Sequence, residues 1–94
     1  MTVVGLGKLD EFKQKHSDST SQLDAWVREA KDAEWRTPQD IKDRYAHASF
    51  LPGNRVVFNI KGNRYRLDIK VNYATQVVLV VRLGTHAEYA DWSF

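Results

Sequence analysis

Residues 55–71, which read RVVFNIKGNRYRLDIKV, decide the fold of this chain. Apolar and polar side chains alternate on both sides of the pair Gly62-Asn63, as they do in β-strands that bury one face. The pair itself suits a tight two-residue turn between antiparallel strands. The stretch therefore predicts a β-hairpin whose strands span residues 55–61 and 64–73.

A two-residue turn also fixes which residues of the two strands lie opposite each other. One face of the hairpin is apolar and predicts part of the core: Val56, Phe58, Ile60, Tyr65, Leu67, Ile69 and Val71. The other face pairs Lys61 with Arg64, Asn59 with Arg66, Val57 with Asp68, and Arg55 with Lys70. This second face therefore carries five cations and one Asp.

Facing cations repel each other by up to about 1 kcal/mol for a cross-strand pair, so a sequence adapted only for stability would alternate the signs. The face is either a solvated surface, with Asp68 paired to its neighbours, or a surface that binds the phosphates of a nucleic acid. The whole chain has a net charge of +2, but residues 48–94 carry +3 and residues 1–47 carry −1. Arg82, on a further strand predicted at residues 76–83, belongs to the basic half.

The N-terminal half has the periodicity of helices. After a short strand at residues 2–4, Leu6, Leu9 and Phe12 recur at helical spacing. Ser19 with Gln22 predicts a capping box for a second helix, with Trp26 on its buried stripe. Thr37-Pro38 with Asp40 predicts the start of a short third helix that reaches Tyr45. Helices followed by strands indicate the α+β class, in a single domain of residues 1–94.

Several functional classes are excluded or disfavoured. The chain has no cysteine, so it has neither disulfides nor thiolate metal sites. It lacks a Gly-rich phosphate loop, a metal-ligand spacing and a nucleophile elbow, and we expect neither a metal nor a cofactor. No apolar run approaches the ~18 residues of a membrane span. We therefore expect a soluble, cytoplasmic protein that does not act at a membrane.

The last turn of the chain carries a possible proton-transfer group. Gly84 is expected to end the third strand, and Thr85 with Glu88 predicts a capping box for a helix through Trp92. His86 would be the first residue of that helix, where free backbone N–H groups favour anions, and Tyr89 would share its side. A histidine, a tyrosine and several cations together suit phosphodiester cleavage. Alternatively, His86 is only a locally bonded helix-start residue. His16 and His47 are expected at the surface.

The hairpin stretch together with residues 84–89, which read GTHAEY, resembles the HigB messenger-RNA interferase toxins of type II toxin–antitoxin modules. The resemblance covers nearly the whole chain. It implies a RelE-like fold, in which N-terminal helices pack on a small twisted antiparallel sheet whose opposite face binds RNA. It also implies an endoribonuclease that cleaves messenger RNA, often on the ribosome, and a helix-turn-helix antitoxin, HigA, as partner. The matching positions are Asn59, Gly62, Asn63, Arg66, Thr85, His86, Glu88 and Tyr89.

These inferences together predict a metal-independent endoribonuclease. The ribose 2′-hydroxyl would attack the adjacent phosphate, with Arg66 and either Lys70 or Arg64 stabilising the transition state. His86 or Tyr89 would transfer a proton, so that the predicted catalytic residues are Arg66, Lys70, His86 and Tyr89. The predicted RNA-binding residues are Arg55, Asn59, Lys61, Asn63, Arg64 and Arg82. Two other functions remain open: a non-catalytic RNA- or DNA-binding module, and a domain whose sheet docks an acidic peptide.

Overall fold

The predicted hairpin lies at the centre of a five-stranded sheet in the computed structural model, which describes residues 1–94. The strands are β1 (Thr2–Val4), β2 (Ser49–Leu51), β3 (Arg55–Ile60), β4 (Tyr65–Asn72) and β5 (Val77–Thr85). Their order across the sheet is β1-β5-β4-β3-β2. β1 runs parallel to β5 and the other neighbours are antiparallel, so the sheet is mixed and not wholly antiparallel as predicted.

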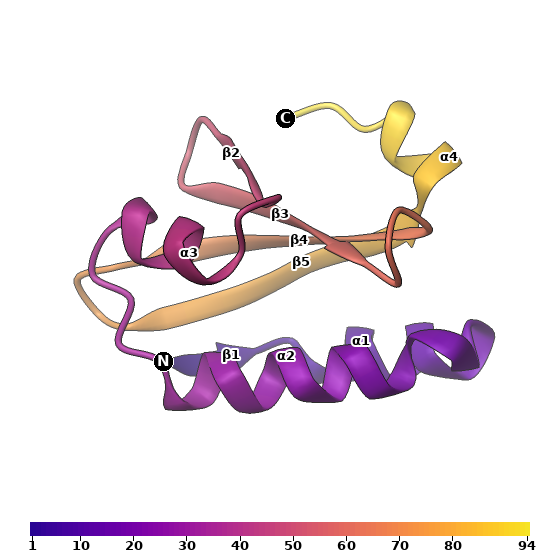
Figure 1. The fold of residues 1–94 in the computed structure, drawn as a ribbon, viewed down its shortest axis with the longest axis horizontal. Helices are drawn as coiled ribbons and strands as arrows, with labels where there is room; N and C mark the ends of the chain where they lie inside the picture. Colours follow the sequence, from indigo (N-terminus) through magenta and orange to yellow (C-terminus); the bar gives the residue numbers. More distant parts are fainter.

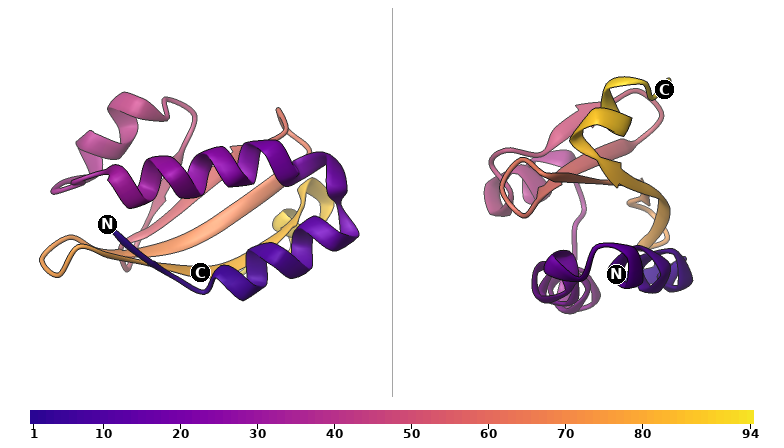
Figure 2. Two further views of the ribbon diagram at one scale, coloured as in Figure 1. Left: turned by 90° about the horizontal axis from the view of Figure 1, so that it is seen from below. Right: turned by 90° about the vertical axis from the view of Figure 1, so that its right-hand side faces the viewer.

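The helices divide unequally between the two faces of the sheet. They are α1 (Leu6–Lys15), α2 (Thr20–Asp32), α3 (Pro38–Arg44) and α4 (His86–Ala90), with a short 3₁₀ turn at Ser17–Ser19. α1 and α2 cover one face, whereas α4 and the C-terminal segment lie on the other side (Figures 1 and 2). None of the helices combines the length and apolarity that a membrane span needs.

The core lies between α1, α2 and the apolar face of the sheet. All seven hairpin residues predicted for this face are buried, as are Trp26 and Trp35, which confirms that part of the prediction. Trp26 meets Phe58 edge to face, with 5.6 Å between the ring centroids. His16 is half-buried, because its ring packs 4.5 Å from that of Phe12 and 5.0 Å from that of Tyr65, and the prediction of a surface position was wrong. His47 is exposed as predicted.

The hairpin has the predicted register but a longer turn. Asn59 pairs with Arg66 and Arg55 with Lys70, and the last pair of the ladder is Ile60 with Tyr65. Lys61–Arg64 therefore form a four-residue loop, in which Lys61 and Gly62 have positive φ, at 54° and 63°. A loop centred between residues 62 and 63 gives one register whether it holds two residues or four. The prediction of a two-residue turn was wrong, but the register and the assignment of side chains to the two faces are confirmed.

One of the two predicted capping boxes forms, with Thr85 and Glu88 at the start of α4. The predicted start of α3 at Thr37 is confirmed, and Thr37 with Asp40 forms a capping box there too. At the start of α2, the Ser19 hydroxyl donates instead to the His16 carbonyl, 2.7 Å away. The Gln22 amide oxygen accepts a hydrogen bond from the backbone N–H of Lys61. Gln22 thus links α2 to the hairpin loop, and the capping box predicted at Ser19 was wrong.

β5 contains an irregularity that orients its second half. Ile69 pairs with Val80 and Asp68 with Arg82, so Val81 is an extra residue in β5 and forms a β-bulge. Side chains alternate between faces along a strand, and one extra residue reverses the alternation. Arg82 therefore shares the outer face with Asp68 instead of pointing into the core. β5 also continues to Thr85, so the prediction that Gly84 ends this strand was wrong.

Candidate functional site

Arg66 is the centre of a cluster on the outer face of the sheet. Its Nη1 donates to the backbone carbonyls of Asn63, at 2.9 Å, and Tyr65, at 3.1 Å. Its Nη2 donates to Asn63 Oδ1 at 2.7 Å and lies 2.9 Å from His86 Nδ1. The side chain is therefore largely covered, with only 6% of the residue exposed. The solvated surface position expected from the hairpin pattern was wrong for Arg66.

The contact with Arg66 defines the hydrogen-bond role of His86 Nδ1. A guanidinium can only donate hydrogen bonds, so Nδ1 of His86 accepts in this contact. In the tautomer that accepts through Nδ1, the ring hydrogen is on Nε2. His86 is exposed, so a ligand can reach this side chain.

Tyr89 completes the cluster from the same side of α4 as His86. Its ring lies over the Arg66 guanidinium, with 5.2 Å from Cζ to the ring centroid, which is a cation–π distance. The structure thus brings together three of the four residues predicted to be catalytic. Gly84 lies opposite Arg66 in the ladder between β4 and β5, so the cluster forms where α4 leaves the sheet.

The start of α4 offers fewer free N–H groups than the sequence suggests. The backbone N–H of His86 donates to the Arg64 carbonyl at 2.8 Å. Thr85 N–H donates to the Glu88 carboxylate at 3.0 Å, and Glu88 N–H donates to the Thr85 hydroxyl at 3.2 Å. The bond from the Thr85 backbone lowers the pKa of Glu88. Glu88 is thus the capping acid, as predicted, and the expected anion site at this helix start is largely occupied.

An ion-pair triad lies further along the outer face. Asp68 is fully buried between two arginines: its carboxylate accepts from Arg55 through both oxygens and from Arg82 Nε at 2.9 Å. The hydrogen bonds to Asp68 raise the pKa of Arg55. Rings from the end of the chain cover both guanidiniums. Arg55 and Arg82 were predicted to bind RNA, but their charge is already partly balanced by Asp68.

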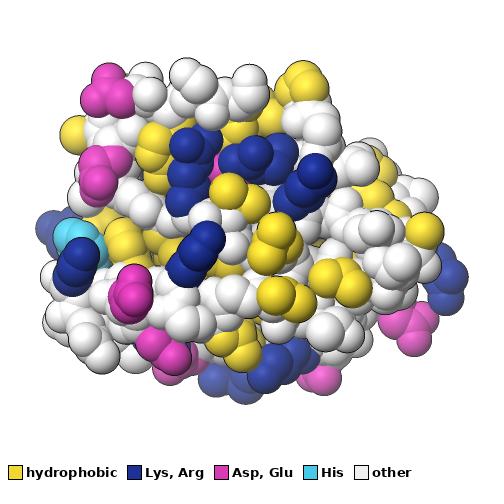
Figure 3. Space-filling model, turned by 180° about the vertical axis from the view of Figure 1, so that it is seen from behind, with side chains coloured by type: hydrophobic (Ala, Val, Ile, Leu, Met, Phe, Trp, Pro, Cys, Tyr) yellow, Lys and Arg dark blue, Asp and Glu magenta, His cyan; other side chains and the backbone are white.

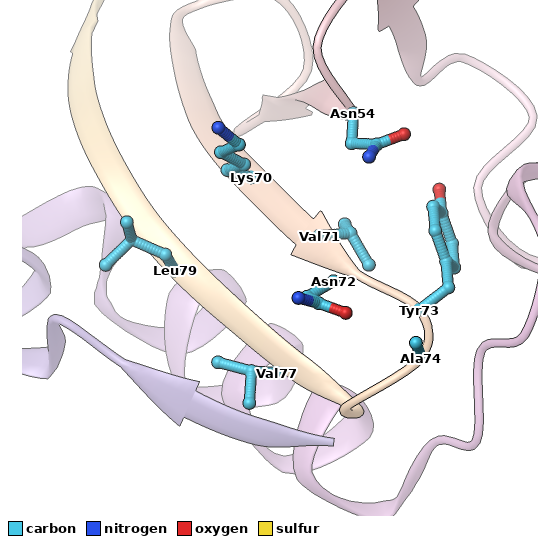
Figure 4. Close-up of a pocket in the computed structure, with 8 residues that line it drawn as sticks. All are labelled: Asn54, Lys70, Val71, Asn72, Tyr73, Ala74, Val77 and Leu79. Atoms are coloured by element: carbon cyan, nitrogen blue, oxygen red, sulfur yellow. The ribbon is translucent and has the colours of Figure 1, made fainter.

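Lys70 is the predicted catalytic residue that does not join the Arg66 cluster. It lies four residues along β4 from Arg66 on the same face, or roughly 13 Å at the rise of a strand. Its side chain is exposed and lines a shallow pocket of about 460 Å³ with Asn54, Asn72, Tyr73 and Leu79 (Figure 4). Lys70 therefore extends the basic surface away from Arg66.

The remaining predicted residues have separate positions around the loop of the hairpin. Asn63 holds Arg66, as described above. Arg64 is exposed and pairs with Asp18 at 2.8 Å, which raises the pKa of Arg64. Lys61 is exposed on the loop, and Asn59 is half-buried opposite Arg66. Figure 3 shows how Lys and Arg side chains gather on one side of the molecule, next to a band of hydrophobic side chains.

No group of three or more His, Asp or Glu side chains could hold a metal ion.

A comparison with family models identifies the chain. The model for HigB toxins, the RelE-like toxic component of a toxin–antitoxin system, matches residues 19–92. The chain belongs to the HigB toxin family. The match covers most of the chain, and a comparison with individually curated proteins gives no match.

Membership of the HigB family confirms the resemblance seen in the sequence. The protein is a toxin of a toxin–antitoxin system, and its family implies an antitoxin as partner. Four helices and a mixed five-stranded sheet agree with the predicted α+β, RelE-like fold. The matched residues include the whole hairpin and the Arg66 cluster.

The sequence did not predict that the C-terminal residues of this HigB toxin pack on the outer face of the sheet. The predicted helix ends early, at Ala90, and the chain then passes over the arginines of the ion-pair triad. A Cβ on Gly84 would lie only 2.7 Å from Trp92 Cζ2, so Gly84 is what admits the Trp92 ring. Three of the last six residues are aromatic, which was a signal in the sequence. Only the fold shows that these rings contact arginines on the sheet.

Proposed function

We propose that this HigB-family toxin is a metal-independent endoribonuclease that cleaves messenger RNA. The observation that carries the proposal is the convergence of Arg66, His86 and Tyr89 on the face of the sheet that α1 and α2 leave uncovered. A fixed cation, an imidazole and a phenol within contact distance supply the groups that phosphodiester cleavage needs. Membership of a RelE-like toxin family supports the same activity.

In the proposed reaction, the 2′-oxygen bonds to the adjacent phosphorus and the bond from phosphorus to the 5′-oxygen breaks. The 2′-hydroxyl loses a proton and the 5′-oxygen gains one. Arg66 stabilises the extra negative charge of the pentacovalent state. The hydrogen bonds of its two terminal nitrogens go to the protein, whereas Nε–H makes no hydrogen bond within the protein, so Nε is the donor that we assign to phosphate.

His86 is the proposed proton-transfer residue, and substrate binding would prepare it. A phosphate bound at Arg66 Nε can accept a second hydrogen bond from the neighbouring Nη2, and it competes there with His86 Nδ1. Opening that contact frees Nδ1 to accept a proton, while Nε2–H is already available to donate a hydrogen bond. Tyr89 is the alternative proton carrier, and its ring also holds Arg66 in place.

The RNA would extend from this cluster along the basic face. Lys70, which is too far from Arg66 to share one phosphate with it, would bind the backbone at the far end. Lys61, Arg64 and Asn59 would contact it near the hairpin loop. We propose that the substrate is messenger RNA in the cytoplasm, and that a HigA-like helix-turn-helix antitoxin blocks this surface.

The proposal is tested by incubating the purified protein with an end-labelled transcript in the presence of EDTA. We expect fragments with a 5′-hydroxyl, a large loss of cleavage in Arg66→Lys, and normal cleavage in Arg28→Lys. Arg28 is an exposed arginine on α2 and controls for the exchange of a guanidinium for an ammonium group. Binding without any cleavage would instead favour a non-catalytic RNA-binding module.

A further inference from the structure

The C-terminal aromatic residues form a layer over the ion-pair triad. The Trp92 ring lies 4.3 Å from Arg82 Cζ. The Phe94 ring lies 5.0 Å from Arg82 Cζ and 5.2 Å from Arg55 Cζ. Trp92 also meets Tyr89 edge to face, with 5.5 Å between centroids, so the layer continues into the Arg66 cluster. Aromatic rings and guanidiniums thus form one continuous layer from Arg66 to Arg55.

Phe94 is the open end of this layer. It is 52% exposed, more than the other exposed large hydrophobic residues, Val4 and Leu79. An exposed apolar residue is ordinary by itself. Phe94 differs because two arginines support its ring, and Asp68 holds both arginines in place. The two arginines brace the ring, and its exposed part is open to a ligand.

The arginines beneath the layer are poorly placed to bind phosphate. The Asp68 carboxylate and the two rings already occupy Arg55 and Arg82, and Arg82 Nη2 also donates to the Ser93 carbonyl at 2.9 Å. A nucleic acid that approaches this region therefore meets an aromatic surface before it meets a cation. Aromatic side chains bind unpaired bases by stacking, and an adjacent cation strengthens such contacts.

We propose that Phe94 stacks on an unpaired base of the RNA, next to the nucleotides held at the Arg66 cluster, with Trp92 and the two arginines as its support. This inference rests on the proposed function, because the ligand is the same RNA. A stacked base must be free of pairing, so the site selects single-stranded over double-stranded RNA. Stacking accepts every base, so Phe94 confers little sequence preference.

The test measures binding without cleavage. The probe is a short single-stranded RNA with 2′-O-methyl groups, which lack the attacking hydroxyl, and its partner has the same backbone with abasic sites. Fluorescence anisotropy gives the Kd of each for the wild type, Phe94→Ala, Phe94→Leu and Phe94→Trp. Val4→Ala, which removes another exposed apolar side chain on β1, is the matched control.

We expect Phe94→Ala and Phe94→Leu to weaken binding of the base-containing probe by roughly 5- to 100-fold, as for loss of one stacked base. Phe94→Trp and Val4→Ala should bind it normally, and the abasic probe should not distinguish any of the variants. Unchanged binding by Phe94→Ala would overturn the stacking site. Tighter binding would also overturn it, because Phe94 would then be a lid over the cations. A wild type that binds neither probe would refute the proposed function as well.

Discussion

The close contact between Gly84 and Trp92 gives a quantitative prediction for Gly84→Ala. The new methyl group would lie 2.7 Å from Trp92 Cζ2 and 3.2 Å from Glu88 Cβ. Trp92 must move, and its contacts with Arg82 and Tyr89 are lost. A cation–π contact at a partly exposed site and an aromatic pair contribute together about 1–2.5 kcal/mol. Alanine recovers about 0.4–1 kcal/mol by restricting the unfolded chain, so the net loss of unfolding free energy is centred on about 1 kcal/mol.

Thermal unfolding followed by circular dichroism measures this loss. For a chain of this size, about 1 kcal/mol corresponds to a Tm lower by roughly 4–8 °C. Trp92→Ala provides the second half of a double-mutant cycle. Because the methyl group then has no ring to displace, Gly84→Ala should cost little or nothing in the Trp92→Ala background. An equal loss in both backgrounds would refute the reasoning, since the strain would then lie in the backbone.

Three further predictions concern single side chains of the outer face. Asp68→Asn leaves Arg55 and Arg82 without their shared carboxylate and should lower the unfolding free energy, measured by urea titration, by about 2–3 kcal/mol. An unchanged midpoint of urea unfolding would mean that the ion pairs contribute nothing to stability. The pKa of Glu88 is lowered from its ordinary value of 4.5, so the ionised carboxylate contributes to stability above pH 4.5. This contribution is lost as the pH falls toward the lowered pKa. The Tm of Glu88→Gln should therefore fall less steeply with acid than the Tm of the wild type. His86→Gln should fold normally but lose about 10²–10⁴-fold in the rate of transcript cleavage, and a near-parental rate would assign proton transfer to another group.

The hairpin was predictable because apolar and polar side chains alternate along it, with Val57 as the one apolar residue on the outer face. Val56, Phe58 and Ile60 alternate with Arg55, Val57 and Asn59, which fixes the buried face and the register. The start of α4 was predictable for a similar reason, because Thr85 and Glu88 bond locally. Such features depend on neighbours in the sequence, and the sequence is enough to find them.

Other features depend on contacts that no local pattern encodes. Alternation assigns Arg66 to the outer face but says nothing of Asn63 and α4, which cover it there. The VVLVVRL stretch of residues 77–83 is apolar almost throughout, so it does not reveal the bulge at Val81. The position of Trp92 and Phe94 over arginines of two strands also depends on the path of the chain after α4.

The bulge at Val81 gives β5 one residue more than its ladder with β4 needs. If Val81 were deleted, Val80 would still lie opposite Ile69 and Arg82 opposite Asp68, now in a regular ladder. Arg82 and Gly84 would keep the outer face, and the strand would lose only the local bend and extra twist that a bulge produces. A deletion of Leu83, beyond the bulge, would instead turn Gly84 to the core face and remove it from beneath Trp92. Deletions in this strand should therefore survive selection at Val81 but not between Arg82 and Thr85.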